Sequence, residues 1–121
     1  MRKRILIVDD QRDVAMLLHH YIQNEKYEVE EVHSGAEALT RVFAGGFDLV
    51  ILDYAMRDIK GDRVCMLIRE DDKTKELPVI MVTAHSEIDD HVFRQYGATD
   101  VLYKPVSADD MQLVIEKYLS K

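Results

Sequence analysis

Five polar residues that could act together in one site each follow a short apolar run in this chain of 121 residues. They are two adjacent carboxylates, a third carboxylate, a hydroxyl and an amine: Asp9, Asp10, Asp53, Thr83 and Lys104. Adjacent carboxylates repel each other and resist dehydration, so the pair favours a cation beside it, and oxygen ligands of this kind favour Mg²⁺. Asp10 is equally suited to cap the helix that follows, so the pair alone leaves both interpretations open.

The other three residues suit phosphoryl chemistry. A carboxylate such as Asp53 can act as the nucleophile that accepts a phosphoryl group, and Mg²⁺ (with Mn²⁺ as an alternative) would offset the negative charge of both. Lys104 is a mobile point charge for a phosphate oxygen, and Thr83 offers a hydroxyl donor. Taken singly, Asp53 could be a turn residue, Lys104 a solvated charge and Thr83 an ordinary strand residue. Because complementary groups recur at four strand ends, we predict a single active pocket.

The apolar runs predict the strands that position these residues. Four-residue runs of branched side chains, such as Ile5–Val8 and Leu49–Leu52, are typical of strands buried on both faces of a parallel sheet. A weaker, alternating pattern predicts a strand nearer an edge. The predicted strands cover residues 5–8, 28–33, 48–53, 79–83 and 101–103.

Helical spacing of apolar residues predicts helices between the strands. The first covers about residues 12–25, the second begins at Ser34 with Glu37 completing a capping box, and Gly45-Gly46 ends it. A third follows Gly61, a fourth covers about residues 87–96, and a fifth follows Pro105. The predicted buried faces include Val14, Leu17, Leu18, Tyr21 and Ile22; Leu39, Val42 and Phe43; Val64, Leu67 and Ile68; and Met111, Val114, Ile115, Tyr118 and Leu119.

Strands that alternate with helices predict an α/β fold, a parallel sheet with helices on both faces and right-handed crossovers. In such sheets, functional residues gather beyond the carboxyl ends of the strands. The length suits one domain, residues 1–121, with no linker or repeat.

Composition restricts the function classes. The net charge of −7 argues against nucleic-acid binding within this chain, and the sequence holds no zinc spacing and no Gly-rich phosphate loop. The one cysteine, Cys65, cannot form an intrachain disulfide, and no apolar run is long enough to cross a membrane. We therefore expect a cytoplasmic protein without membrane contacts.

These motifs resemble the phosphoacceptor receiver domains of two-component response regulators over essentially the whole chain. The matching segments are ILIVDD at the first strand, DLVILDYAM with the later Gly61, VTA at Thr83, and GATDVLYKP ending at Lys104-Pro105. The resemblance implies a doubly wound (βα)5 sandwich with strand order 2-1-3-4-5. It also implies a cis peptide bond between Lys104 and Pro105.

The resemblance also implies roles for individual residues. Asp53 would be the phosphoacceptor, Asp10 a direct metal ligand and Asp9 a partner acting largely through water. Asp53 and the backbone carbonyl of Ala55 would complete the protein ligands of Mg²⁺. Thr83 and Lys104 would contact the phosphoryl group. Their inward movement on phosphorylation would change the conformation of the domain surface.

Several positions depart from the family pattern. Val101 lies where the family commonly has an aromatic switch residue, and its short, stiff side chain cannot swing as one. Tyr103, on the same strand face, is either its substitute or a partner-facing surface residue. Arg57, next to Met56, replaces the usual proline and either contacts phosphate or is solvated. Two further modulating positions are Ala55 and His85, and His85 either positions a hydrolytic water or is an exposed loop residue.

The resulting prediction is a signalling switch, not a turnover enzyme. It would take a phosphoryl group from the phosphohistidine of a histidine kinase or phosphotransfer protein. Its output would pass through the fourth helix, last strand and last helix to a downstream protein or a homodimer. The alternatives are a phosphate-independent interaction module and a Mg²⁺-dependent aspartyl-phosphate phosphohydrolase, which would need a second acid where Ala55 stands. A flavodoxin-like cofactor binder lacks its phosphate loop here.

Overall fold

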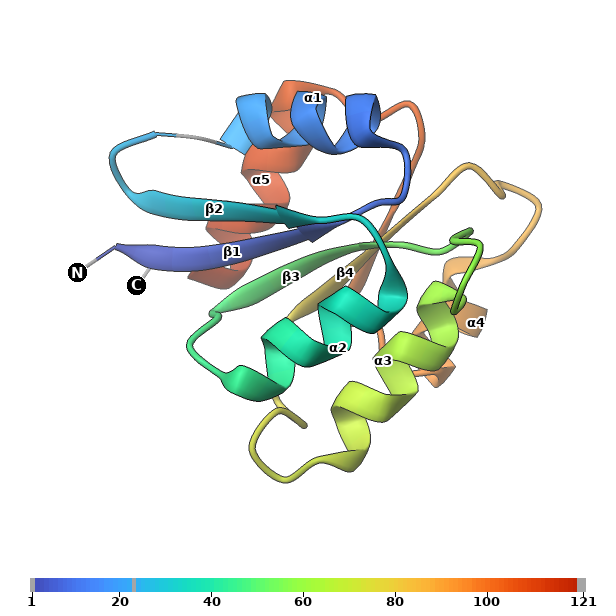
Figure 1. Cartoon of the computed structure of the whole chain (residues 1–121). Helices are drawn as coiled ribbons and strands as arrows, with labels where there is room; N and C mark the ends of the chain where they lie inside the picture. Colours follow the sequence, from blue (N-terminus) through green and yellow to red (C-terminus); the bar gives the residue numbers. More distant parts are fainter. Residues whose placement is uncertain (1, 23, 120–121) are drawn as a thin grey trace.

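The computed structural model describes residues 2–22 and 24–119, which form one α/β sandwich (Figure 1). Five parallel strands lie in the order β2-β1-β3-β4-β5, so the predicted fold class and strand order are confirmed. The strands are β1 (Lys3–Val8), β2 (Tyr27–Val32), β3 (Leu49–Asp53), β4 (Val79–Thr83) and β5 (Asp100–Tyr103). The helices are α1 (Arg12–Ile22), α2 (Gly35–Ala44), α3 (Gly61–Glu70), α4 (Asp90–Gln95) and α5 (Ala108–Leu119).

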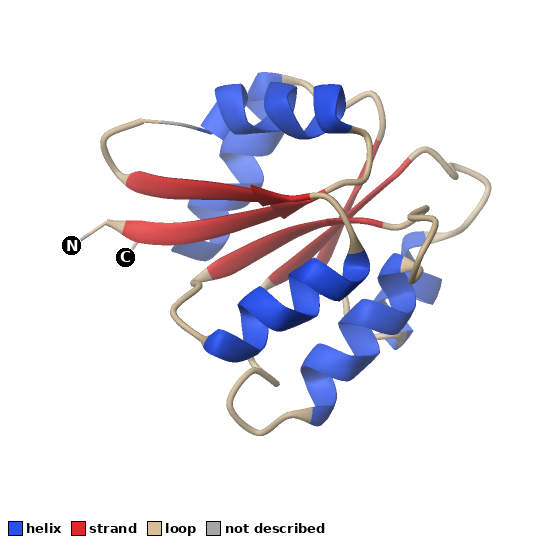
Figure 2. Cartoon of the chain, in the orientation of Figure 1, coloured by secondary structure: helices blue, strands red, loops and turns tan. Residues whose placement is uncertain are grey.

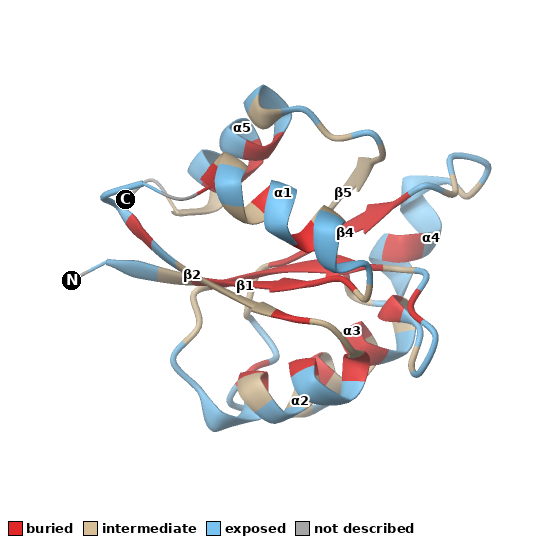
Figure 3. Ribbon diagram, turned by 45° about the horizontal axis from the view of Figure 1, so that its top comes forward, coloured by how far each residue is buried: buried red, intermediate tan, exposed pale blue. Residues whose placement is uncertain are grey.

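The sheet divides the core into two apolar layers, because successive strand residues point to opposite faces. In β1, Leu6 and Val8 pack with the layer under α2, α3 and α4, whereas Ile5 and Ile7 pack with the layer under α1 and α5. Figure 2 shows these helices on the two sides of the sheet, and Figure 3 shows that the central strands are buried. Burial on both faces explains why β1, β3 and β4 are apolar without alternation.

The predicted helix start at Ser34 is confirmed, but the return bond of the capping box goes to the residue before the N-cap and not to Ser34 N–H. The Ser34 hydroxyl oxygen accepts the Glu37 N–H at 3.1 Å, and the Glu37 carboxylate reaches back to the His33 N–H at 3.1 Å. The helix ends before Gly45, whose φ of 91° lies in the left-handed region that favours glycine. None of the helices in the described ranges is long and apolar enough to cross a membrane.

Four predictions about the helices were wrong. The first helix ends at Ile22 and not near residue 25, because Asn24 and Tyr27 pair in an isolated bridge across the turn before β2. The fourth helix begins at Asp90, not at residue 87, because the turn that joins Ile88 N–H to the His85 carbonyl precedes it and Asp89 caps it. Leu17 and Phe43 share the helical spacing of buried residues but are 48% and 45% exposed. Both residues lie at the edge of the apolar face of their helix. At this edge, helical spacing alone does not distinguish buried from exposed side chains.

Candidate functional site

The predicted carboxylates meet at the carboxyl end of the sheet. One ligand oxygen from each of Asp9, Asp10 and Asp53 lies within 4.8 Å of the others. β1 and β3 are neighbours, which places the residues that follow Val8 beside the end of β3. Asp9 is fully buried and Asp53 is 5% exposed, so two of the three charges are removed from water.

Lys104 is the cation that faces these carboxylates. Its Nζ lies 3.2 Å from Asp9 Oδ2 and 3.3 Å from Asp53 Oδ1. Burial lowers the pKa of Lys104, but the charges of Asp53 and Asp9 outweigh burial and raise that pKa above its ordinary value. The ammonium therefore stays charged at neutral pH.

The buried Lys104 ammonium and the exposed Arg57 guanidinium, whose Nε lies 3.4 Å from Asp10 Oδ2, do not balance three carboxylates. The pKa of Asp53 is raised, first by burial and then by the charge of Asp9, and Lys104 offsets these effects only in part. The site thus has an excess of negative charge in a dehydrated position, which a divalent cation would relieve. Three carboxylate groups are also the donor set that suits a hard cation such as Mg²⁺ or Mn²⁺.

The adjacent carboxylates, Asp9 and Asp10, accept backbone N–H groups from two different segments. Asp9 Oδ1 accepts the Gln11 N–H at 2.9 Å, just before α1. Asp10 Oδ2 accepts the backbone N–H of Arg57 at 3.1 Å, so it faces the loop after β3 and not the first turn of α1. The Arg57 side chain is 91% exposed, with Nε 3.4 Å from Asp10 Oδ2. Arg57 is therefore solvated, and it also lies at the rim of the carboxylate cluster.

Thr83 and His85 are linked at the end of β4. The buried Thr83 hydroxyl oxygen accepts the His85 N–H at 2.9 Å. The imidazole of His85 lies 2.9 Å from Glu87 through Nδ1 and makes an edge contact with the Tyr54 ring, with the ring centroids 5.5 Å apart. The loop that follows Thr83 is therefore tied both to this hydroxyl and to the residue after Asp53.

The two predicted switch positions on β5 differ in environment. Val101 is partly buried and packs against the apolar layer under α3 and α4. The Tyr103 hydroxyl donates to the Ile88 carbonyl at 2.7 Å and so joins β5 to the loop before α4. The Lys104-Pro105 peptide bond is cis, as predicted.

The residues directly after Tyr54 separate into exposed and buried positions. Ala55 is exposed, as a residue at the mouth of a site would be, whereas Met56 is 3% exposed and belongs to the core under α2 and α3. The Met56 side chain thus anchors this loop to the interior.

The same loop caps a helix that lies elsewhere in the sequence. The Asp58 carboxylate accepts the backbone N–H groups of Gly35 and Ala36, both at 3.0 Å, in the first turn of α2. These hydrogen bonds, the one from Gly35 first, lower the pKa of Asp58. Sequence reasoning missed this contact, since a cap that comes from a distant loop leaves no local spacing signal.

Gly61 fits closely against the strand that carries Asp53. Its N–H donates to the Tyr54 carbonyl at 2.8 Å. A Cβ on Gly61 would lie 2.5 Å from the Asp53 carbonyl oxygen and 2.8 Å from the Tyr54 Cα. Both neighbours are backbone atoms, so a side chain here has to displace the loop after β3.

We expect Gly61→Ala to lower the free energy of unfolding by about 2 kcal/mol, as overpacking does. Alanine is the better helix former, so a purely local effect would raise stability instead. Denaturant unfolding followed by circular dichroism measures the change. Gly45→Ala is the control, because its Cβ meets no atom within 4 Å and only the positive φ is penalised, by about 1 kcal/mol. Equal stability of Gly61→Ala and the wild type would contradict the close approach.

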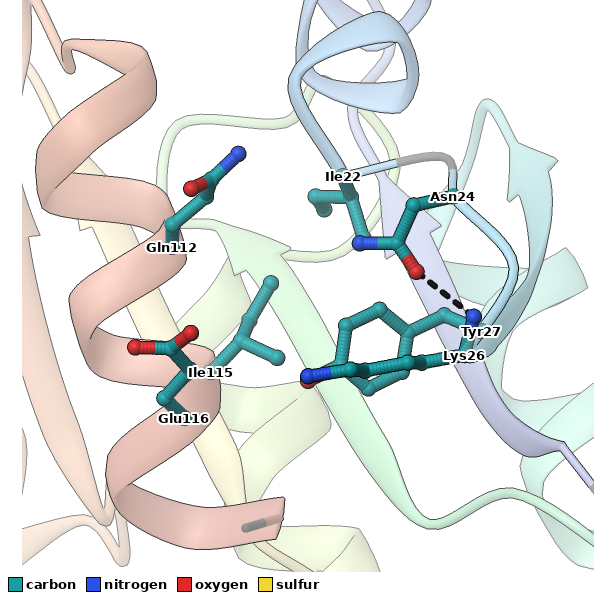
Figure 4. Close-up of a pocket in the computed structure, with 7 residues that line it drawn as sticks. All are labelled: Ile22, Asn24, Lys26, Tyr27, Gln112, Ile115 and Glu116. Carbon is teal, nitrogen blue, oxygen red and sulfur yellow. Dashed lines mark hydrogen bonds between the residues drawn. The ribbon is translucent and has the colours of Figure 1, made fainter.

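A small cavity lies far from this site, between the turn before β2 and α5 (Figure 4). Its volume is about 30 Å³, which is far below that of a typical ligand pocket. The Asn24 side-chain oxygen accepts the Lys26 N–H at 2.7 Å beside it and shapes the turn. The cavity is a packing gap lined by Ile22, Asn24, Lys26, Tyr27, Gln112, Ile115 and Glu116.

The doubly wound fold and its carboxyl-end cluster define an α/β domain with three carboxylates close enough together to hold a cation. Residues 5–116 match the model of the response regulator receiver domain, and the chain belongs to this family. It is 34% identical over 119 residues to the transcriptional regulatory protein ResD of Bacillus subtilis, covering 98% of this chain and 48% of ResD. The response regulator ArlR of Staphylococcus aureus is 32% identical, with 98% of this chain and 53% of ArlR covered.

Solved structures show the same architecture. The response regulator TrrA of Thermotoga maritima, solved in complex with Mg²⁺ and BeF, gives a TM-score of 0.86 with 36% identity, covering 97% of this chain and 99% of TrrA. The chemotaxis protein CheY4 of Vibrio cholerae gives a TM-score of 0.90 with 27% identity, covering 98% of this chain and 100% of CheY4. The chain spans about half the length of the curated relatives that it matches.

Proposed function

We propose that Asp53 accepts a phosphoryl group from the phosphohistidine of a histidine kinase or a histidine phosphotransfer protein, in a reaction that needs Mg²⁺. The observation that carries this proposal is the cluster of Asp9, Asp10 and Asp53 within 4.8 Å, with Lys104 Nζ 3.3 Å from Asp53. A family member, TrrA, was solved in complex with Mg²⁺ and BeF. We also propose that the protein is located in the cytoplasm.

In this reaction an Asp53 carboxylate oxygen forms a bond to phosphorus as the donor's P–N bond breaks. The electron pair of that bond stays on the imidazole nitrogen of the donor. Asp9, Asp10, Asp53 and the Ala55 carbonyl would hold Mg²⁺, which supplies positive charge against the phosphoryl oxygens when bound. Lys104 then exchanges its contact with Asp53 for one with a phosphoryl oxygen.

Phosphorylation would act as a switch, because it replaces one buried charge by a larger anion. Thr83 donates its hydroxyl hydrogen to a phosphoryl oxygen while its own oxygen still holds the His85 N–H. Movement of Thr83 shifts the loop that leads to α4, which Tyr103 joins to β5. A downstream protein or a second copy of the chain would read the face formed by α4, β5 and α5.

The test is labelling of the whole chain by phosphoramidate with and without Mg²⁺, followed by mass spectrometry of the intact protein and of its peptides. We expect one phosphoryl group on Asp53 in the presence of Mg²⁺ and none in Asp53→Asn. Asp72→Asn, whose side chain is 97% exposed in the loop after α3, is the matched control and should label normally.

Full labelling of Asp53→Asn, or no labelling of the wild type, would refute the proposal. Absence of labelling would instead favour a phosphate-independent interaction module. Sustained release of phosphate over many turnovers would favour a phosphohydrolase. We expect stoichiometric labelling that decays without sustained turnover.

A further inference from the structure

The loop between β4 and α4, which projects beyond the end of β4 in Figure 1, is tied down by a series of hydrogen bonds. The Thr83 hydroxyl oxygen accepts the His85 N–H at 2.9 Å, and the His85 carbonyl accepts the Ile88 N–H at 3.0 Å. The Ile88 carbonyl in turn accepts the Tyr103 hydroxyl at 2.7 Å. Each bond begins on the residue where the previous one ends, so the series connects the Thr83 hydroxyl to β5.

The sheet closes this series into a ring. Thr83 and Tyr103 are register partners in the parallel ladder between β4 and β5. Lys104, the residue that follows Tyr103, donates its backbone N–H to the Thr83 carbonyl at 2.7 Å. Tyr103 is thus joined to Thr83 through the sheet on one side and through the loop on the other.

The Tyr103 hydroxyl holds a loop that is otherwise largely open to solvent. The exposed residues between Thr83 and α4 are Ala84, Ser86, Glu87 and Asp89. Ile88 packs against the apolar layer under α3 and α4, and Tyr103 is partly buried. Burial, and then the charges of Asp90 and Asp89, raise the pKa of Tyr103, so the hydroxyl keeps its proton at neutral pH and stays a donor.

We propose that the Tyr103 hydroxyl is a latch that holds this loop, and through it Thr83, in the unphosphorylated position. The latch rests on the proposed function, because the phosphoryl group on Asp53 is what attracts the Thr83 hydroxyl. As Thr83 moves toward that group, it takes the His85 N–H with it and draws the Ile88 carbonyl away from the Tyr103 hydroxyl. Tyr103 is therefore a positioning residue that acts on Thr83 through the loop.

The latch favours the unphosphorylated conformation, because its hydrogen bond is made only there. Tyr103→Phe keeps the aromatic ring and removes only the hydroxyl. The variant should therefore bind an analogue of the phosphoryl group about fivefold more tightly than the wild type, the factor that one ordinary hydrogen bond contributes.

The test is calorimetric titration of the whole chain with beryllofluoride in the presence of excess Mg²⁺. The related TrrA was solved in complex with Mg²⁺ and BeF. We expect the fivefold gain in affinity in Tyr103→Phe. Tyr118→Phe is the matched control and should bind like the wild type, because the Tyr118 hydroxyl donates to Asp100 of β5 at 2.8 Å, outside the ring of hydrogen bonds.

Carbon-13 spectra follow the latch directly. The Cζ resonance of Tyr103, assigned by its absence in Tyr103→Phe, should shift when beryllofluoride and Mg²⁺ are added to the wild type, since the hydroxyl exchanges the Ile88 carbonyl for water. A hydrogen bond with a purely structural role would persist in both states and leave this resonance in place.

Equal or weaker affinity in Tyr103→Phe than in the wild type, or an equal gain in Tyr118→Phe, would overturn the latch and leave phosphorylation of Asp53 untouched. A wild type that does not bind beryllofluoride with Mg²⁺ would contradict the proposed function, and the latch with it. Circular dichroism confirms that each variant is folded.

Discussion

We expect Lys104→Met to lower the free energy of unfolding of the metal-free protein by about 3 kcal/mol, the size typical for removal of one partner of a buried ion pair. The cause is the pair Asp9 and Asp53, which lose their nearest cation while staying buried. Mg²⁺ should then stabilise Lys104→Met more than it stabilises the wild type, because the carboxylates no longer share their charge with an ammonium. Thermal or urea unfolding with and without Mg²⁺ measures both effects.

Lys75→Met provides the matched control for this prediction. Lys75 is 55% exposed and lies 3.8 Å from an exposed aspartate, so its loss should change stability by less than about 0.5 kcal/mol. If Mg²⁺ stabilised Lys104→Met and the wild type equally, then Lys104 and the cation would not compete for the same carboxylates.

The second large effect is expected at Arg69, which joins the end of α3 to the loop that directly follows it and to the distant loop before β5. Its guanidinium donates to the Gly97 carbonyl at 2.8 Å, to the Leu77 carbonyl at 2.7 Å and to the Thr99 hydroxyl at 3.1 Å. Further contacts reach the carbonyls of Thr74 and Lys75. Arg69→Ala leaves these acceptors without a charged donor, so we expect a loss of about 3 kcal/mol.

Two variants isolate the role of that guanidinium in urea unfolding. Arg63→Ala removes an exposed arginine of the same helix and should change stability by less than about 0.5 kcal/mol. Arg69→Lys keeps the charge but lacks the planar fork, so it should recover less than half of the loss. Full recovery of stability in Arg69→Lys would show that the positive charge alone, without the guanidinium geometry, accounts for the stabilisation.

The sequence predicted the sheet and the residues at its carboxyl end, because both depend on short-range patterns. A strand buried on both faces needs a continuous apolar run, and a functional strand end is marked by a polar residue directly after it. The alternation of runs and amphipathic segments then leaves few topologies. The clustering of Asp9, Asp10 and Asp53 was predicted in this way.

The contacts that the sequence did not predict connect residues far apart in the chain. Arg69 and Asp58 look like ordinary surface charges in the sequence. Arg69 donates to the Gly97 carbonyl and Asp58 accepts the Gly35 N–H, and no spacing rule identifies contacts this far apart in the chain. The start of α4 was misplaced because Glu87 and Ile88 continue the helical pattern while a turn precedes the cap at Asp89. Helix ends depend on such local competition between caps.

The cap supplied by Asp58 has a consequence for regulation from outside the site. One short loop carries Asp53 at its start and fixes the first turn of α2 at Asp58. A protein that bound α2 and displaced its first turn would therefore change the free energy of a binding or chemical step at Asp53. By thermodynamic reciprocity, an event at Asp53 would change the affinity of that protein by the same factor. The surface of α2 would thus be a second route of communication, separate from the proposed output face formed by α4, β5 and α5.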